Sequence, residues 1–513
     1  MKFNNKDLGI VVTPPQTVEY IISRLGKIQE EDKILDPCVG PGIFIKKLLE
    51  SGITKNQIFA YDINSSFKGE LKELGVSFKE QDTLLALYPE SYNEFDFIVG
   101  NPPYLNKAST YVRTNKVKLR KIYGKINAHE TYAMFIVNSI WRLKEGGKLG
   151  FITSDSFLTL STHRKLRKFI LDNCIINEIL LAPKYLFSNQ KVSINPAILI
   201  LTKYPGKKFK KNRQENLMRI IPRVNNEQEY LKPKNAREIK QVNYNSLPFN
   251  IFFIDVDDQI IELFEKAPRL KNFVKGYIGM HTHDNRKYIA AIENTELANI
   301  FRRRNKKIIN QENKYKVISQ DSLKSKDWKP YLKRGGSDQY FRAIMEALDW
   351  NADSISQYDI PINVSFEKEG IVISGISSRL AARYMPEGCY WDSNKAIGFY
   401  IIDNSISIEY ILGLLNSSLY NYLMKGVINN TNSIQISGIH ALPFIIPDND
   451  VREKVEKLVK KIIKNKKQDL NYDYIIEQKE IDEIIFNFYK NKFNLLDQLK
   501  NKLDNEYSIY KKN

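Results

Sequence analysis

The sequence is poor in cysteine and lacks any long hydrophobic run. Its 513 residues contain three cysteines, which are isolated from one another: Cys38, Cys174 and Cys389. Without a Cys-x-x-Cys pair, neither a cysteine zinc site nor a disulfide framework is expected, and so few unpaired thiols suit a reducing compartment. No leader peptide and no run of 18 apolar residues is seen, so we expect a cytoplasmic protein without a membrane span.

Negative charge is also in deficit. Asp and Glu number 59 against 78 Lys and Arg, which gives a formal net charge of +19. This excess suits a partner rich in phosphate, because each neutralised phosphate releases counterions. Two basic runs, residues 207–213 and 302–307, are candidate contacts. Either run alone is equally typical of a solvated surface, so the charge indicates only the class of partner.

The chain is too long for a single core, since cores stop growing at about 250–300 residues. A first break is predicted at Tyr204-Pro205-Gly206, where the runs that form the first sheet are expected to be complete. Residues 206–445 show short apolar runs and many aromatics without a regular period. From residue 446, apolar stripes at helical spacing face Lys and Glu. We therefore predict three parts: 1–205, 206–445 and 446–513.

A third glycine is missing from the first recognisable turn. Residues 34–44 indicate the end of a buried strand, a Gly-x-Gly turn at Gly40 and Gly42, and the start of a helix. Dinucleotide sites use G-x-G-x-x-G to bind pyrophosphate at the helix N-terminus. Here Asp36 precedes the turn, and a carboxylate at that place repels phosphate and suits an ammonium group.

Two further acids follow predicted strands. Asp62 lies at the end of the apolar run 58–63, and Asp82 follows a candidate strand at 76–78. In nucleoside-binding α/β folds, an acid after the second strand binds ribose hydroxyls. A lone acid in such a place is usually a helix cap. Three acids in this order instead favour a nucleoside that carries an amino acid, such as S-adenosylmethionine.

The most informative stretch is a tetrapeptide after the apolar run 95–100, Asn101-Pro102-Pro103-Tyr104. Two prolines cannot continue a strand, and they bias the preceding residue towards an extended conformation. The result is a rigid corner that joins an amide, backbone carbonyls and an aromatic ring. Asn-Pro-Pro also makes ordinary turns, so the position of the corner behind the acid-bearing strands supports the functional interpretation.

Over residues 1–203 these motifs resemble the adenine-N6 DNA methyltransferase family, in the γ-type order that places the cofactor motifs first. The tetrapeptide matches the family's catalytic motif completely, whereas the cofactor loop differs from the commoner form at Cys38-Val39 and Pro41. The resemblance implies S-adenosylmethionine as the cofactor. The implied cofactor-binding residues are Thr13, Asp36, Pro37, Gly40, Gly42, Asp62, Ile63, Asp82 and Thr83.

The resemblance also implies the fold. We expect an α/β protein with the Rossmann-like sheet of class I S-adenosylmethionine-dependent methyltransferases, a mixed α+β target-recognition region and a helical C-terminal tail. Asn101, Pro102, Pro103 and Tyr104 are the implied catalytic residues. Tyr104 and Phe187, which precedes the apolar run 194–201, would contact the target base. Aromatics near strands are more often core residues, and that alternative stays open for Phe187.

The chemistry can be argued from the residues alone. The exocyclic amine of adenine is a poor nucleophile because its lone pair is delocalised into the ring. If the Asn101 side chain and the Pro102 carbonyl each accept one N–H, that lone pair becomes localised on the nitrogen. The two acceptors also stabilise the positive charge that develops there, as the donors of an oxyanion hole stabilise negative charge. Transfer from an activated sulfonium then needs positioning more than a strong base. A base in duplex DNA must be flipped out to reach this corner and stack on Tyr104.

Four segments after residue 206 resemble the target-recognition regions of large adenine methyltransferases: 276–285, 328–336, 377–384 and 414–419. Within them we select four DNA-binding candidates, Lys333, Arg334, Arg379 and Arg383. If residues 377–384 are helical, Arg379 and Arg383 lie one turn apart and reach the same groove or backbone. Arginine binds guanine edges and phosphates alike, so the mode of contact stays open.

Metal and nuclease chemistry find less support. His281-x-His283 has no accompanying cluster of acids or cysteines, so no metal is expected. Glu477-x-Lys479 falls in the helical tail without a strand beside it, so no fused nuclease is expected. A separate cognate restriction endonuclease is therefore a candidate partner. We expect the tail to form a hairpin packed on the protein, with dimerisation as the alternative, so both a monomer and a dimer stay open.

The sequence therefore predicts a site-specific adenine DNA methyltransferase that acts on double-stranded DNA, in restriction–modification or phage defence. One rival is an amino-methyltransferase of protein glutamine or ribosomal RNA, which the long basic C-terminal part disfavours. A second is an inactive DNA-binding module, which the intact Asp36, Asp82 and Asn101 disfavour. A third is a nicotinamide-dependent oxidoreductase, which the missing third glycine disfavours. The DNA recognition sequence is not legible in the chain.

Overall fold

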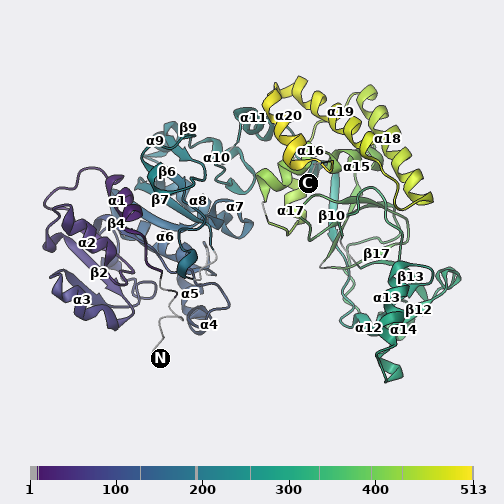
Figure 1. Cartoon of the computed structure of the whole chain (residues 1–513), viewed down its shortest axis with the longest axis horizontal. Helices are drawn as coiled ribbons and strands as arrows, with labels where there is room; N and C mark the ends of the chain where they lie inside the picture. The colour runs from purple at the N-terminus through teal and green to yellow at the C-terminus, as the bar shows by residue number, and fades with distance from the viewer. Residues whose placement is uncertain are drawn as a thin grey trace. The chain divides into compact units, whose positions relative to one another are not determined.

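The computed structural model of the chain describes residues 9, 11–126, 129–190, 194–254, 256–333, 336–393, 395–429 and 431–510. The chain divides into two compact units, Met1–Val256 and Asp257–Asn513. Figure 1 colours the first unit from purple to teal and the second from teal to yellow. No helix among the described residues is long and apolar enough to cross a membrane.

The described residues of the first unit form a nine-stranded sheet, in the order β3-β2-β1-β4-β5-β7-β6-β8-β9. From β3 to β5 all neighbours are parallel, whereas β7 runs antiparallel to both β5 and β6. Strand bounds are β1 (Ile34–Asp36), β2 (Ile58–Asp62), β3 (Ser77–Glu80), β4 (Phe95–Gly100), β5 (Leu143–Ser154), β6 (Cys174–Leu181), β7 (Pro196–Lys203), β8 (Leu217–Ile221) and β9 (Arg237–Lys240). The predicted Rossmann-like sheet is confirmed, and its parallel strands end at a common edge.

Helices join and cover these strands (Figure 1). Their bounds are α1 (Pro15–Ser23), α2 (Ile43–Glu50), α3 (Lys68–Glu73), α4 (Thr110–Thr114), α5 (Lys116–Tyr123), α6 (Thr131–Arg142), α7 (Ser156–Thr159), α8 (Arg164–Asn173), α9 (Lys210–Glu215) and α10 (Asn243–Ser246). Apolar side chains of α1, α2 and α3 share one core with β1, β2 and β4. A Cβ atom on Gly150 of β5 would lie 2.7 Å from Cγ2 of Ile21, so glycine there permits the close approach of α1.

The first unit continues beyond the boundary predicted at residue 205. Strand β8 pairs in parallel with β6, and β9 pairs antiparallel with β8, so the expectation that the sheet is complete by residue 205 is wrong. The physical reason is that β6 would otherwise be an edge strand with unpaired backbone groups. The basic run 207–213 forms the start of this return, partly as α9.

The second unit contains two sheets among its described residues, in the orders β10-β18-β15-β16 and β12-β11-β14-β13-β17. Strand bounds are β10 (Val274–Ile278), β11 (Ile289–Ile292), β12 (Lys316–Ile318), β13 (Trp328–Leu332), β14 (Glu346–Asp349), β15 (Gly370–Ser374), β16 (Ala382–Met385), β17 (Tyr390–Trp391) and β18 (Ala396–Ile401). The mixed α+β character predicted for this region is confirmed. Its irregular sequence period reflects strands of two to six residues.

The second unit also contains helices, and the longest of them lie in its C-terminal part. Their bounds are α11 (Asp258–Lys266), α12 (Asn285–Tyr288), α13 (Glu296–Asn305), α14 (Ala352–Ile355), α15 (Ile408–Asn416), α16 (Ser418–Asn421), α17 (Ile436–Ala441), α18 (Asn449–Gln468), α19 (Ile475–Phe493) and α20 (Asp497–Lys502). The predicted helical tail is confirmed. It packs on α15, where a Cβ atom on Gly413 would lie 2.5 Å from Cγ1 of Val455 in α18.

Candidate cofactor pocket and active site

A pocket opens at the carboxyl edge of the parallel strands in the first unit. It encloses about 830 Å³ of empty space, part of it open to solvent. All but Gly42 of the predicted cofactor-binding residues line it: Thr13, Asp36, Pro37, Gly40, Asp62, Ile63, Asp82 and Thr83. Asn101 and Pro103 line the same pocket. Segments far apart in the sequence supply one site because the strands that carry them end at one edge.

Asp36 is the last residue of β1, and its side chain is buried. Its Oδ1 accepts a hydrogen bond of 3.1 Å from the backbone N–H of Cys38. Burial raises the pKa of Asp36 to about 8, and the charge of Asp62 contributes in the same direction. An ammonium group beside this carboxyl group would favour its ionised form and lower its pKa, so the site is suited to bind a cation.

Asp62 connects the glycine turn to β2. Its Oδ2 accepts a hydrogen bond of 2.8 Å from the backbone N–H of Gly40, and its Oδ1 accepts one of 2.8 Å from Asn64. Gly40 and Gly42 have φ of +52° and +83°, which other residues adopt only at a cost. A Cβ atom on Gly42 would also lie 2.9 Å from Cδ2 of Leu71. Gly42 therefore shapes the turn before α2 instead of lining the pocket.

Asp82 follows β3 and is held by both main chain and side chain. Its Oδ1 accepts hydrogen bonds of 3.1 and 3.2 Å from the backbone N–H groups of Leu84 and Leu85. The hydroxyl of Tyr111, in α4, lies 3.0 Å from each carboxylate oxygen. Burial raises the pKa of Asp82. The sequence analysis missed Tyr111 as a pocket residue, and no motif surrounds it that could have signalled this position.

Asn101 follows β4, and its amide is fixed by the N-terminal segment. Its Nδ2 donates hydrogen bonds of 3.0 Å to the carbonyl of Val11 and 3.0 Å to Oγ1 of Thr13. These two bonds fix the orientation of the amide, in which Nδ2 is the donor and Oδ1 is the hydrogen-bond acceptor. Thr13 was predicted only as a cofactor contact, and the structure adds that it orients Asn101.

Thr131 fixes the backbone that follows the two prolines. Its hydroxyl donates a hydrogen bond to the carbonyl of Pro103 and accepts one of 3.0 Å from the N–H of Leu105. Its own N–H donates to the carbonyl of Leu105 at 2.9 Å. Thr131 is the first residue of α6, so this helix holds the Asn-Pro-Pro-Tyr corner in place. No sequence motif marks Thr131 for this role.

Tyr104 lies among aromatic rings. Its ring centroid is 6.2 Å from that of Phe187 and 6.4 Å from that of Tyr132. Phe187 is buried in the core that α1 and α2 share with the sheet. It is therefore a core residue whose ring also lies beside that of Tyr104. Pro102 is buried and, like Tyr104, lies outside the pocket lining. A contact between the Pro102 carbonyl and a substrate therefore stays a prediction.

The DNA-binding candidates lie in the second unit. The helical premise for residues 377–384 is wrong, because residues 377–381 have no regular secondary structure and β16, paired with β15, begins at Ala382. Arg383 is buried in that strand, so it is not available at the surface. Arg379 donates a hydrogen bond of 2.8 Å to the carbonyl of Ser508. Lys333 forms an ion pair with Asp392, and Arg334 lies outside the described residues.

The basic run 302–307 forms the exposed end of α13 and the turn after it. Arg304, within the run, lies 5.7 Å from the ring centroid of Tyr315, and Arg286 lies 5.0 Å from it. The first basic run, 207–213, is also largely exposed, although Lys208 is paired with Glu145. Both runs are therefore surface features, and one member of the second, Arg304, lies beside an aromatic ring.

Two family matches cover separate parts of the chain. Residues 43–187 match the Eco57I restriction-modification methylase family, and residues 313–444 match the TaqI-like C-terminal specificity domain. The first match contains Asp62, Asp82, Asn101 and Phe187. The second lies within the second unit and contains β12 to β18.

The chain is similar to curated type II methyltransferases. The type II methyltransferase M.HincII of Haemophilus influenzae is 28% identical over 205 residues, which are 39% of this chain and 38% of that protein. M.BstVI of Geobacillus stearothermophilus is 30% identical over 235 residues, which cover 38% and 42% of the two chains. The chain thus spans about two-fifths of the length of these relatives. The type IIL restriction-modification enzyme MmeI, solved in complex with DNA, shares the fold with a TM-score of 0.55 at 13% identity, over 93% of this chain and 72% of that one.

The donor groups of the pocket fit the cofactor of such methylases. Asp36 suits an ammonium group, Asp62 lies where an acid binds ribose hydroxyls, and Asp82 lies beyond it along the same edge. The chain therefore contains one region that matches the Eco57I restriction-modification methylase family, with a pocket that fits S-adenosylmethionine, and one that matches the TaqI-like C-terminal specificity domain.

Proposed function

We propose that the chain methylates the 6-amino group of adenine within a short sequence of double-stranded DNA. The observation that carries the proposal is that Asn101, with its amide nitrogen anchored, lines the same pocket as the three acids. The type II methyltransferases among its relatives and the DNA in the MmeI structure support the substrate class. In this proposal unit Met1–Val256 performs the transfer and unit Asp257–Asn513 selects the DNA sequence.

The residues of the pocket divide the work of binding. Asp36 holds the ammonium group of the cofactor, Asp62 the ribose hydroxyls and Asp82 the adenine end. S-adenosylmethionine supplies a methyl group that is already activated on a sulfonium. Positioning therefore contributes more to the rate than proton transfer does.

Asn101 prepares the acceptor amine. Because Nδ2 is committed to Val11 and Thr13, Oδ1 accepts one N–H of the adenine amine, and the Pro102 carbonyl accepts the other. These two acceptors localise the lone pair on nitrogen and stabilise the positive charge that develops on it. Thr131 keeps the carbonyl groups of the corner in place through its bonds to Pro103 and Leu105.

The target base is flipped out of the duplex to enter the corner. Tyr104 stacks on it, and Phe187 supports the Tyr104 ring from its other side in this proposal. The exposed basic run 302–307 supplies phosphate contacts, and the affinity that it adds falls as salt rises. Lys333 and Arg379 contribute less, because Asp392 and the carbonyl of Ser508 already engage their charged groups. The setting that fits is restriction–modification in the cytoplasm, with a separate endonuclease as the cognate partner.

Methyl transfer from labelled cofactor tests the proposal. Asn101→Ala should lower transfer to DNA by at least about 100-fold, since it removes an acceptor aimed at developing charge, while the affinities for S-adenosylmethionine and DNA stay within about threefold. Asn106→Ala, at an exposed asparagine five residues on, is the matched control. Undiminished transfer by Asn101→Ala would refute the assignment.

Mapping of modified bases in DNA from cells that express the chain then identifies the target atom. Methylated adenine within one short sequence is expected. Label that appears instead in ribosomal RNA or in protein glutamine would favour the rival amino-methyltransferase, which uses the same corner on another substrate.

A further inference from the structure

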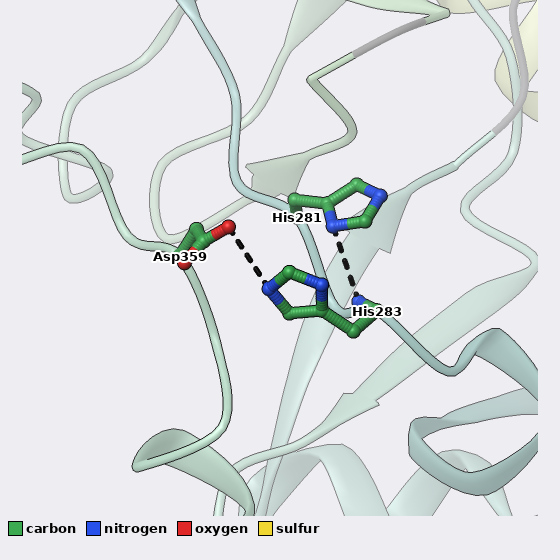
Figure 2. A group of neighbouring side chains, drawn as sticks. All are labelled: His281, His283 and Asp359. Atoms are coloured by element: carbon green, nitrogen blue, oxygen red, sulfur yellow. Dashed lines mark hydrogen bonds and ion pairs between the residues drawn. The ribbon is translucent and has the colours of Figure 1, made fainter.

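A second cluster of ligand-bearing side chains lies in the other unit, away from the pocket. His281 and His283 belong to the segment between β10 and α12, and Asp359 belongs to the segment that follows α14. One donor atom of each lies within 4.8 Å of the others, and the described part of the chain holds no other such group of His, Cys, Asp or Glu. Figure 2 shows both rings beside the carboxylate. The expectation that no acid accompanies this histidine pair is therefore wrong, because the fold brings Asp359 from a distant segment.

The backbone fixes this cluster independently of the three side chains. The N–H of His281 donates to the carbonyl of Asp359 at 3.1 Å, and the N–H of Asp359 donates back at 3.0 Å. Met280 is held in turn by hydrogen bonds of 2.9 Å to Trp391 and 3.0 Å from Ser393. The two segments that carry the ligands are thus already joined, so little ordering is needed to bring the donor atoms together.

The side chains are close to the separation that a metal ion requires. Nε2 of His283 lies 2.9 Å from Oδ2 of Asp359, and Nδ1 of His281 accepts a hydrogen bond of 3.3 Å from the N–H of His283. Zinc ligands at about 2.0–2.1 Å with tetrahedral angles lie about 3.3 Å apart. To hold an ion, His283 and Asp359 would therefore open by a few tenths of an ångström, and the donor atom of His281, within 4.8 Å of both, would close towards them.

The donor set selects the kind of ion. Two imidazoles and one carboxylate suit borderline divalent transition metals, whereas Mg²⁺ and Ca²⁺ prefer oxygen ligands throughout. The side chains of His283 and Asp359 are 58% and 73% exposed, so an ion can enter and water can complete its coordination. We propose that His281, His283 and Asp359 form a surface site for a divalent transition metal ion such as Zn²⁺.

The site has a structural consequence. The histidines precede β11, Asp359 follows β14 and α14, and β11 pairs with β14 in the five-stranded sheet. A bound ion therefore clamps two connections of that sheet to each other. Because the ion binds the folded form, it raises the stability of the unit that contains the specificity domain.

Calorimetric titration of the metal-free full chain with Zn²⁺ tests the proposal. One ion per chain with micromolar affinity is expected, together with a rise of a few degrees in the Tm of the second unit. His281→Ala, His283→Ala and Asp359→Ala should each weaken binding at least about tenfold. Co²⁺ should bind to the unaltered chain and show visible absorption that His283→Ala abolishes. Mg²⁺ should bind far more weakly.

His129→Ala, which changes an exposed histidine of the first unit, is the matched control and should leave the Zn²⁺ affinity unchanged. Circular dichroism of the three variants should match that of the unaltered chain, because the backbone bridge between the segments needs none of their side chains. No Zn²⁺ binding by the folded chain, or a Zn²⁺ affinity of the His281→Ala and His283→Ala variants equal to that of the unaltered chain, would overturn the site. Mg²⁺ binding as tight as that of Zn²⁺ would overturn the choice of ion.

Discussion

The hydroxyl of Tyr104 donates a hydrogen bond of 2.5 Å to Oδ1 of Asn101. That oxygen is the acceptor which the proposed reaction assigns to the adenine amine. Because Nδ2 of Asn101 stays bonded to Val11 and Thr13, the amide keeps its orientation when Tyr104 moves. In the proposed reaction, entry of the target base would therefore exchange one hydrogen bond of Asn101 for another and would free the Tyr104 ring to stack.

Tyr104→Phe should keep turnover within about threefold of the unaltered chain, because the ring that stacks is retained and only the bond to Asn101 is lost. Tyr104→Ala should lower the single-turnover rate by about 10–100-fold, since base stacking contributes about 1–3 kcal/mol. The measurement is single-turnover methylation of DNA with saturating cofactor. Cofactor affinity should change little in either variant, and equal rates for Tyr104→Ala and the unaltered chain would contradict the stacking role.

Thr131→Val should lower kcat by about 10–100-fold, because a small displacement of the corner misplaces the reacting amine. Valine keeps the shape of threonine but removes both hydrogen bonds from its side chain to the corner. Steady-state kinetics with DNA give kcat, and a separate titration gives the affinity for the cofactor. Together they distinguish a loss of positioning from a loss of cofactor binding. Thr131→Ser, which keeps the hydroxyl, should restore most of the rate; a serine variant as slow as the valine variant would argue against positioning by the hydroxyl.

The affinity for S-adenosylmethionine should rise with pH between about 6 and 8. Burial raises the pKa of Asp36 to about 8, so below that pH the free protein carries the proton that must leave when the carboxylate meets an ammonium group. Above about 8 the rise should end, because an α-amino group itself loses its proton near pH 7.7–8.0. Calorimetry at pH 6.5 in buffers of different ionisation enthalpy should register release of up to one proton.

Asp36→Asn is the control for this pH dependence. The variant should bind the cofactor weakly at every pH and release no proton. It should also be more stable than the unaltered chain at pH 7 by about 1 kcal/mol or more. The sign follows from the raised pKa: the unfolded chain ionises Asp36 near its ordinary pKa, so folding becomes less favourable as pH rises from about 4 towards 8. Proton release that persists in Asp36→Asn would assign it to another group.

Glu178→Ala should lower the free energy of unfolding of the first unit by about 3 kcal/mol. Glu178 is fully buried in β6 and accepts hydrogen bonds of 2.6 Å from Tyr20 and 2.8 Å from Arg219, with Arg24 at 3.0 Å. Its removal leaves these partners without their acceptor. Denaturant unfolding gives the value, and Glu238→Ala, at an exposed position of β9 in the same sheet, should cost less than about 0.5 kcal/mol. Equal losses in both variants would show that the buried cluster contributes nothing special.

Local sequence was sufficient to predict those site residues that lie at strand ends and in turns. The strand before Asp62, the turn at Gly40 and Gly42, and the strand before Asn101 were each predicted within a few residues. The role of an acid or a glycine at such a place can be predicted from its residue type and its position in the chain, without knowledge of its spatial neighbours. The pocket then followed, because parallel strands that carry these residues must end at one edge.

Contacts between segments that are distant in the chain could not be predicted from the sequence. Tyr111 reaches Asp82 and Thr131 reaches Pro103 from helices that bear no motif. The boundary at residue 205 failed because whether β8 and β9 complete the first sheet depends on an edge strand that no local pattern marks. Arg379 and Arg383 would share one helix face only if their segment were helical, but pairing with β15 made the second of them part of a buried strand.

By itself, the sequence determined the order of the motifs, the rigid corner at Asn101 and the excess of positive charge, because each depends on residue type and nearest neighbours. Only the tertiary structure decided that Tyr104 occupies the Asn101 acceptor, that Thr131 fixes the corner, and that Asp359 stands beside His281 and His283. The physical reason is that hydrogen bonds and ligand clusters form between whichever groups folding brings within about 3 Å, and the covalent order of the chain does not contain those distances.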